Sequence, residues 1–124
     1  MDIYLTDRES DIMRVLWEHG ASTVTEVRDH LADELAYTTV LTILRTLETK
    51  GYVEHEEEGR THRYSATVEQ QAARKSALMH VASKFFQGSA ELLMTQLVSD
   101  QKLSKEQIAR LRKLLDEKAK GTKS

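Results

Sequence analysis

Threonine and arginine side chains form the most distinctive chemical pattern in the sequence. Five threonines and Arg45 occur in the twelve residues from Thr38 to Thr49, a segment with helical periodicity. At 100° per residue they lie on or beside the side of that helix opposite Val40 and Leu44. The set comprises Thr38, Thr39, Thr42, Arg45, Thr46 and Thr49. Threonine is a poor helix former, so a face that only meets water would more often use Glu, Lys, Gln or Ala.

The major groove of a DNA duplex would favour these side chains. The threonine methyl can pack on the thymine methyl, and its hydroxyl can bond to a base edge or a phosphate oxygen. Arg45, at the centre of the face, can make a bidentate contact to guanine. The face carries no acidic residue. Two simpler interpretations stay open: a solvated helix that happens to be rich in threonine, and a surface ion pair between Arg45 and Glu48.

Groups suited to catalysis or metal binding do not occur in a recognisable spacing. The chain has no cysteine, which excludes disulfides, thiolate metal sites and cysteine nucleophiles. No two histidines lie three or four residues apart, and no HExxH, P-loop, GxGxxG or GxSxG motif is present. The sequence therefore predicts neither an enzyme nor a protein that holds a cofactor or a metal.

Two capping boxes predict where the first helices begin. Thr6 with Glu9, and Thr23 with Glu26, have the spacing in which two side chains satisfy each other's free backbone donors. Gly20 is placed to end the first of these helices. Both helices therefore begin before the threonine-rich segment.

The threonine-rich helix and a hairpin complete the first predicted domain. The helix is expected over residues 37–50 and ends at Gly51. Strands at 52–55 and 62–65 then form a hairpin whose turn contains one glycine. Three helices followed by a hairpin predict a winged helix-turn-helix DNA-binding domain at residues 1–66.

The predicted hairpin is weaker evidence for DNA binding. Arg60, His62 and Arg63 could contact phosphates or the minor groove beside the recognition helix. Three consecutive glutamates at 56–58 stand in the same turn and would be repelled by phosphate. Either the tip projects away from DNA, or the contacts are few and come from one strand. For the glutamates we expect a solvated loop.

Residues 67–124 are predicted to form a helical dimerisation domain. A long helix from about residue 68 should break at Gly88, a shorter helix follows, and Ser104 with Gln107 begins the last helix. The tail from Lys118 is polar and expected to fray. A body of this size is marginal alone, and its apolar side chains would be buried in a homodimer; packing within one chain is the alternative. The predicted interface residues are Phe85, Phe86, Leu92, Leu93, Leu97, Ile108, Leu111, Leu114 and Leu115.

Charge is distributed unevenly along the chain. The formal net charge is −2, but residues 1–66 hold 7 basic against 14 acidic side chains, and residues 67–124 hold 11 against 6. The half assigned to DNA is therefore acidic, although a basic surface is the usual expectation. DNA binding must then depend on the threonine and arginine face of residues 38–49 and on the two copies of this face in a dimer.

The composition favours a folded protein outside membranes. Apolar residues make up 40% and charged residues 31% of the chain, which argues against disorder. No run of about 18 apolar residues occurs, and the first residues lack a basic-then-apolar signal segment. We expect a cytoplasmic protein without membrane insertion.

The sequence resembles the BlaI/MecI/CopY family of penicillinase repressors over nearly its whole length. The similar segments include Leu5-Thr6-Asp7-Arg8-Glu9, Leu16-Trp17, Ala36-Tyr37-Thr38-Thr39-Val40, His62-Arg63-Tyr64 and Phe85-Phe86-Gln87-Gly88-Ser89. The resemblance implies a dimeric repressor with intertwined C-terminal helices, a palindromic operator, and a membrane sensor metalloprotease as a partner. It gives the role of recognition helix to the segment that contains Thr38, Thr39, Thr42, Arg45 and Thr46.

The chain departs from the family pattern in two places. CopY-type members have a cysteine-rich metal site, which a chain without cysteine cannot form. Penicillin-responsive members are cleaved at an Asn-Phe bond, where this chain has Thr95-Gln96-Leu97-Val98. We predict a homodimeric, sequence-specific repressor. A winged helix used for protein docking and a ligand-sensing winged-helix regulator are the alternatives.

Overall fold

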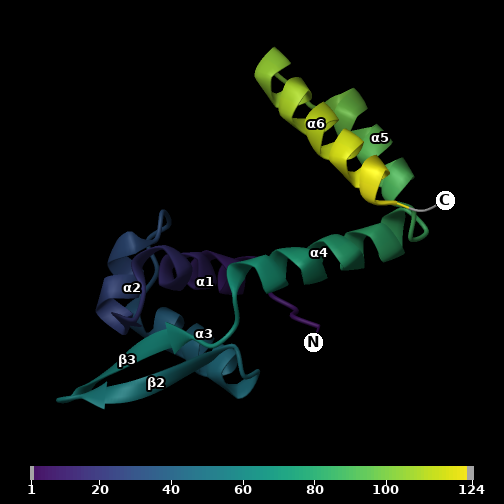
Figure 1. Cartoon of the computed structure of the whole chain (residues 1–124). Coiled ribbons are helices and arrows are strands. Elements are labelled where there is room, and N and C mark those ends of the chain that lie inside the picture. Colours follow the sequence, from purple (N-terminus) through teal and green to yellow (C-terminus); the bar gives the residue numbers. More distant parts are fainter. Residues whose placement is uncertain (1, 123–124) are drawn as a thin grey trace. The chain divides into compact units, whose positions relative to one another are not determined.

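A computed structural model of the chain describes residues 2–122 and contains two compact units, which divide between His80 and Val81 (Figure 1). The first unit contains a bundle of three helices with a small sheet. The second contains two helices and the end of the helix that precedes them. The predicted mainly helical fold with a small hairpin is confirmed.

The three helices of the first unit begin where local capping chemistry predicts. They are α1 (Asp7–His19), α2 (Val24–His30) and α3 (Tyr37–Thr49). Both predicted capping boxes are present: the Thr6 hydroxyl accepts from the Glu9 amide and the Glu9 carboxylate from the Thr6 amide, and Thr23 and Glu26 do the same. Gly20, with a φ of 79°, donates to the Leu16 carbonyl and ends α1.

The sheet contains one strand more than the sequence predicts. Strands β2 (Val53–Glu58) and β3 (Thr61–Ala66) form the hairpin, and the two-residue strand β1 (Ser22–Thr23) pairs with β3, giving the antiparallel order β1-β3-β2. A strand of two residues is too short to show alternation in a sequence.

The hairpin strands are also longer than predicted. The glutamates at 56–58 were expected in a solvated loop, and this expectation is wrong, because all three belong to β2. Gly59 takes a φ of 63°, so the turn needs only two residues between Glu58 and Thr61. Pairing of Glu56 with Arg63 across the strands places opposite charges side by side and offsets the cost of a glutamate-rich strand.

One hydrophobic core holds the first unit together. It combines the inner stripes of the three helices with one face of the sheet, and its fully buried members include Ile12, Met13, Val24, Val27, Val40, Leu44, Leu47 and Tyr64. Ala73 extends it to α4 (Gln70–Phe85), and Trp17 donates its indole N–H to the Val68 carbonyl at 2.9 Å. Three helices and a hairpin around one core form a winged helix-turn-helix.

The second unit contains α5 (Ala90–Asp100) and α6 (Lys105–Gly121). Gln87 and Gly88 take positive φ values and separate α4 from α5, as the glycine predicts. The capping box of Ser104 and Gln107 is present. The tail was expected to fray from Lys118, but α6 continues to Gly121. Because α4 begins in the first unit and ends in the second, the functional boundary expected after residue 66 stays a prediction.

Candidate nucleic-acid interface

The outer face of α3 presents the threonines and the arginine that the sequence singles out. Val40, Leu44 and Leu47 are fully buried. The six predicted side chains, Thr38, Thr39, Thr42, Arg45, Thr46 and Thr49, are all exposed. The core therefore holds α3 by one stripe and leaves the opposite face free.

Backbone hydrogen bonds orient three of these threonines. The hydroxyls of Thr42, Thr46 and Thr49 donate to the carbonyls of Thr38, Thr42 and Arg45, at 2.8, 3.0 and 3.0 Å. Each hydroxyl proton is thereby used within the helix, while the oxygen keeps a lone pair that can accept. This face offers methyl groups and acceptors to a ligand.

Arg45 lies beside the tip of the hairpin. A shallow groove of about 150 Å³ is lined by Val24, Tyr37, Leu41, Arg45, Arg60, Thr61 and His62. The groove therefore brings together Arg45 of α3 with Arg60 and His62, which the sequence assigns to the same function. Two guanidinium groups at one groove provide the local positive charge that the acidic half of the chain lacks overall.

The two faces of the hairpin differ in charge. Successive side chains of a strand point to opposite faces, so the register places Val53, His55 and Glu57 with Tyr64 on the face that packs toward α3. Glu54, Glu56 and Glu58 occupy the other face with Arg63. Most of the negative charge of β2 is thus directed away from the face that carries the groove.

His55 connects the hairpin to α3, a contact that the sequence analysis did not identify. Its Nδ1 lies 2.8 and 2.6 Å from the two carboxylate oxygens of Glu48, and its ring stacks on that of His62 with a centroid distance of 4.2 Å. Within residues 2–122 no ion pair to Arg45 is present, and Glu48 pairs with His55 instead. Two features of the sequence could have indicated this contact. His55 alternates with Val53 and so shares its face of the strand, and Glu48 lies three residues after Arg45 on the helix.

Beneath this contact lies the buried Tyr64. Burial raises the pKa of its hydroxyl, and the Glu48 carboxylate raises it further. The Arg45 guanidinium, which reaches the same hydroxyl, acts in the opposite direction. Arg45 and Glu48 therefore both lie close to one phenol group.

The family model described as the penicillinase repressor matches residues 5–117. The chain belongs to this family. Membership places it among DNA-binding transcriptional regulators and confirms that it is not an enzyme.

Individual members of the penicillinase repressor family are distant in sequence but align along most of their length. The penicillinase repressor of Bacillus licheniformis is 25% identical over 115 residues, which cover 91% of this chain and 90% of that protein. The methicillin resistance regulatory protein MecI of Staphylococcus aureus is 19% identical over 116 residues, covering 92% and 94%.

Two solved structures of the repressor BlaI match part of the chain. The DNA-binding domain of the repressor BlaI matches with a TM-score of 0.52 and 27% identity, over 58% of this chain and 90% of that one. The monomeric form of Bacillus licheniformis BlaI, solved in complex with the blaP half-operator, matches with a TM-score of 0.50, the same identity and the same coverage. The winged-helix fold is thus shared with DNA-binding relatives.

In this chain the Arg63 guanidinium is already bonded to side-chain and backbone oxygens of the first unit. Its Nε donates to Glu58 at 2.8 Å, and its Nη1 donates to Glu26 and to the Ala21 carbonyl, both at 2.9 Å. The bond to Glu58, together with attraction to Glu26, raises the pKa of the guanidinium. Arg63 thus ties the hairpin to the beginning of α2. A phosphate contact by Arg63 stays a prediction and would compete with these bonds.

An ion pair between Lys50 and a buried carboxylate fixes the other end of α3. The Nζ of Lys50 lies 2.7 Å from the Glu9 carboxylate, whose side chain is 5% exposed. Burial alone would raise the pKa of Glu9, but hydrogen bonds from Lys50 and the Thr6 amide outweigh it, so the pKa is lowered. Since Glu9 also caps α1, this pair links the first turn of α1 to the residue that follows α3.

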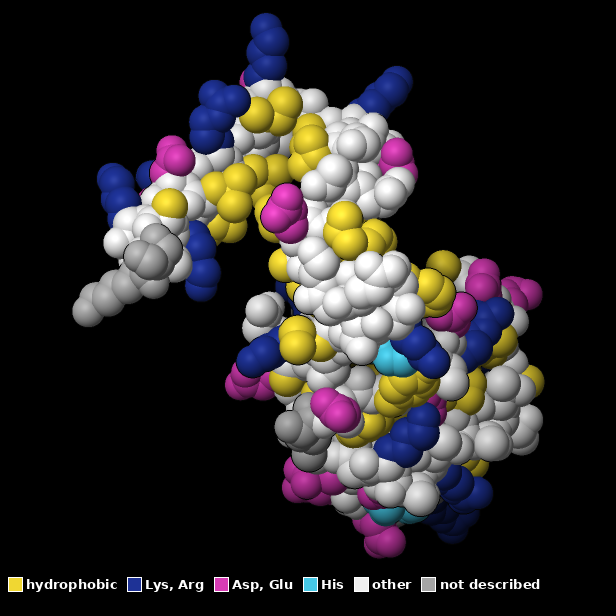
Figure 2. Space-filling view, turned by 90° about the vertical axis from the view of Figure 1, so that its right-hand side faces the viewer, with side chains coloured by type: hydrophobic (Ala, Val, Ile, Leu, Met, Phe, Trp, Pro, Cys, Tyr) yellow, Lys and Arg dark blue, Asp and Glu magenta, His cyan; other side chains and the backbone are white. Residues whose placement is uncertain are grey.

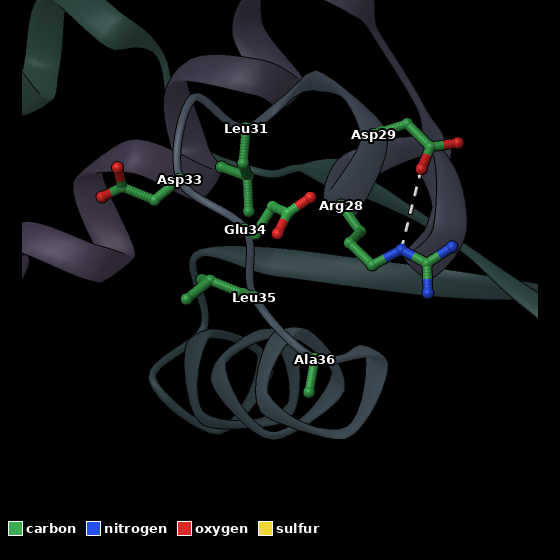
Figure 3. Close-up of a pocket in the computed structure, with 7 residues that line it drawn as sticks. All are labelled: Arg28, Asp29, Leu31, Asp33, Glu34, Leu35 and Ala36. Carbon is green, nitrogen blue, oxygen red and sulfur yellow. Dashed lines mark ion pairs between the residues drawn. The ribbon is translucent and has the colours of Figure 1, made fainter.

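The connection between α2 and α3 contains the pocket drawn in Figure 3, with a volume of about 740 Å³. Asp29 and Asp33 point to opposite sides of it, and Asp29 pairs with Arg28 at 3.6 Å. Asp33 pairs with Arg8 at 2.8 Å. The carboxylates therefore do not converge on a common ligand. Nowhere in residues 2–122 do three or more His, Cys, Asp or Glu side chains come together as a metal site.

The second unit exposes the apolar residues predicted to pair two copies. Neither α5 nor α6 has a buried residue. Exposed members of the predicted set are Phe85, Leu92, Leu97, Ile108, Leu111, Leu114 and Leu115, while Phe86 and Leu93 are half-buried. In the upper part of Figure 2 hydrophobic side chains gather along these helices beside Lys and Arg. None of the described helices combines the length and apolar character that crossing a bilayer requires.

Proposed function

We propose that this chain is a cytoplasmic, homodimeric repressor that binds a palindromic operator. One α3 from each copy lies in the major groove of a half-site, with Thr38, Thr39, Thr42, Thr46 and Thr49 facing bases and backbone. Arg45 makes the base-specific contact, and Arg60 and His62 contact phosphates or the minor groove beside it. Arg63 contributes only where the DNA displaces its bonds to Glu26 and Glu58.

The observation that supports this most directly is the groove shared by Arg45 and Arg60. Specific DNA binding needs a base-reading group and a phosphate-neutralising group at a fixed separation. Here the first stands on a helix held by fully buried residues, and the second on the adjacent hairpin. Family membership supports DNA as the ligand.

The exposed apolar side chains of the second unit support the homodimer. Phe85 is 74% exposed and Leu114 is 61% exposed. Contiguous apolar surface of this kind marks an interaction site, and a second copy would bury the same residues by two-fold symmetry. The BlaI structure with a half-operator is consistent with recognition by half-sites. The sensor metalloprotease implied by the resemblance stays a predicted partner, and the proposal does not depend on it.

The test is binding of the purified protein to its own promoter region, followed by fluorescence anisotropy over a range of salt concentrations. Affinity should fall steeply with salt, because phosphate contacts release counterions. If the protein does not bind this DNA at low salt, the docking interpretation is favoured. If a small molecule raises the melting temperature of the protein, a ligand sensor is favoured.

Variants separate the two arginines. Arg45→Ala should lose about 1–3 kcal/mol of discrimination between operator and random DNA. Arg60→Ala should weaken binding to operator and to random DNA about equally. It should also reduce the slope of log affinity against log salt concentration by about 1. Arg14→Ala, which removes an exposed charge from α1, is the matched control and should change neither. An unchanged specificity ratio in Arg45→Ala would remove that residue from the proposal.

A further inference from the structure

We propose that His55 is a positioning residue for DNA recognition, because it holds the Glu48 carboxylate and so keeps Glu48 from pairing with the Arg45 guanidinium. This inference rests on the proposed function and adds a residue to it. His55 contacts no DNA in this proposal and acts entirely through Glu48.

The problem that His55 solves is built into the sequence of α3. Arg45 and Glu48 are separated by three residues, and side chains at that spacing are neighbours on a helix surface. Opposite charges in such positions attract each other, and an arginine paired with a carboxylate has fewer donors left for guanine. A glutamate at this position would also repel phosphate.

The structure resolves the competition in favour of His55. The Nδ1 of His55 lies within 2.8 Å of both Glu48 oxygens, and the two side chains are only 30% and 33% exposed. An ionised carboxylate can only accept, so Nδ1 carries the proton and donates. Partial shielding from water strengthens this bond relative to a fully exposed ion pair.

Neighbouring groups hold the imidazole in place. Its ring stacks on His62, with an interplanar angle of 14°, and lies 5.4 Å from the ring of Tyr64. On β3 the residue opposite His55 is Tyr64, which is fully buried. The hairpin thus presents His55 to Glu48 from a fixed position. Rotation of Glu48 toward Arg45 would break both hydrogen bonds.

The experiment is a double-mutant cycle between His55 and Glu48. The probes are a duplex containing the sequence that the wild-type protein protects in its own promoter region, and a random duplex of equal length. His55→Ala should lose about fivefold to tenfold in affinity for the first duplex and less for the second, since a bidentate guanine contact is worth about five- to 150-fold. His55→Ala with Glu48→Gln should return to within about twofold of wild type, because the amide lacks the charge that attracts Arg45.

Further variants separate this role from a structural one. Glu48→Gln alone should bind at least as tightly as wild type. His55→Asn, whose amide nitrogen can replace Nδ1, should retain most of the affinity. Glu54→Gln removes a charge from the other face of β2 and is the matched control, expected to leave the specificity ratio unchanged.

Each outcome decides the proposal. No recovery in the double variant, or weaker binding by Glu48→Gln alone, would overturn it. Should His55→Ala unfold, as measured by thermal denaturation, the His55→Asn and Glu48→Gln variants decide in its place. A wild-type protein that binds no DNA would instead contradict the proposed function, so the two failures are distinguishable.

Discussion

Helices α3 and α6 each have an apolar stripe, but only the stripe of α3 is covered within the chain. In α3 the residues Val40, Leu44 and Leu47 are fully buried. In α6 the apolar residues Ile108, Leu111 and Leu114 are 41%, 40% and 61% exposed. Burying apolar surface stabilises by about 25 cal/mol per Å², so the stripe of α3 has already gained this free energy and that of α6 has gained only part of it.

The difference shows how one chain divides two functions between similar helices. A stripe that is fully covered fixes the helix and leaves its opposite face for a ligand, which in α3 is the threonine and arginine face. A stripe that stays open is itself the binding surface, and a second copy is the partner proposed for it. Substitutions in the two stripes should therefore affect different measurements.

The largest effect is expected from the covered stripe. Leu44→Ala should lower the free energy of unfolding of the first unit by about 2–5 kcal/mol, because it leaves a cavity in a closed core. Chemical denaturation followed by circular dichroism measures this. Leu114→Ala is the counterpart in α6 and should change the stability of the first unit little. Equal losses from both would contradict the contrast between the two helices.

The open stripe should control assembly. Leu111→Asp places a charge where two copies are proposed to meet, and removing water from an unpaired carboxylate is costly. We expect a monomer in analytical ultracentrifugation. Operator affinity should fall about a hundredfold or more, since one half-site alone cannot supply the avidity of two. A variant that stays dimeric would show that these residues are not in the interface.

Sequence reasoning was most successful where the responsible contacts are local. The capping boxes at Thr6 and Thr23 act over three residues, and the stripe of α3 repeats within one helix, so both could be predicted. The short strand β1 forms only because it pairs with residues of β3 that lie more than thirty residues away in the sequence. The full length of β2 likewise depends on pairing with β3 across the turn.

The same limit applies to the candidate site. The six exposed side chains of α3 follow from periodicity alone. The bonds of Arg63 to Glu26 and of His55 to Glu48 depend on the strand register and on how the hairpin packs against the helices. Residue types can indicate that an arginine near the wing is available for DNA. Only the fold shows which arginine is already engaged.

The buried pair that follows α3 should make stability depend on pH. The pKa of Glu9 is lowered on folding, so its contribution is complete at neutral pH and is lost as the pH falls from about 4.3 through the folded value. Lys50→Ala leaves this carboxylate buried without its cation and should cost about 1–3 kcal/mol at pH 7.

Glu9→Gln is the companion variant for the pH dependence. It should flatten the loss of stability between about pH 5 and pH 3, since a titrating group has been removed. Thermal denaturation across this range, with Asp33→Asn as a control at an exposed ion pair, measures it. If stability depends on pH in Glu9→Gln as it does in the wild type, other carboxylates cause the loss of stability in acid.

The smallest effect concerns the threonine face and sharpens what that face offers to DNA. The Thr42 hydroxyl proton is bonded to the Thr38 carbonyl, so the methyl and the hydroxyl oxygen are the groups that remain for DNA. Thr42→Ser removes the methyl and should weaken operator binding by about fourfold, the equivalent of one buried methyl group at about 0.8 kcal/mol. Thr42→Val keeps a methyl and should stay closer to wild type.

The matching change in the DNA removes the methyl group of thymine. When the thymines of the operator are replaced with uracil one at a time, a single replacement should weaken binding of the wild-type protein as much as Thr42→Ser does. On that modified operator, Thr42→Ser should bind as tightly as the wild-type protein. If Thr42→Val is instead the weaker variant, the hydroxyl oxygen is the recognised group and Thr42 reads a donor on the base edge.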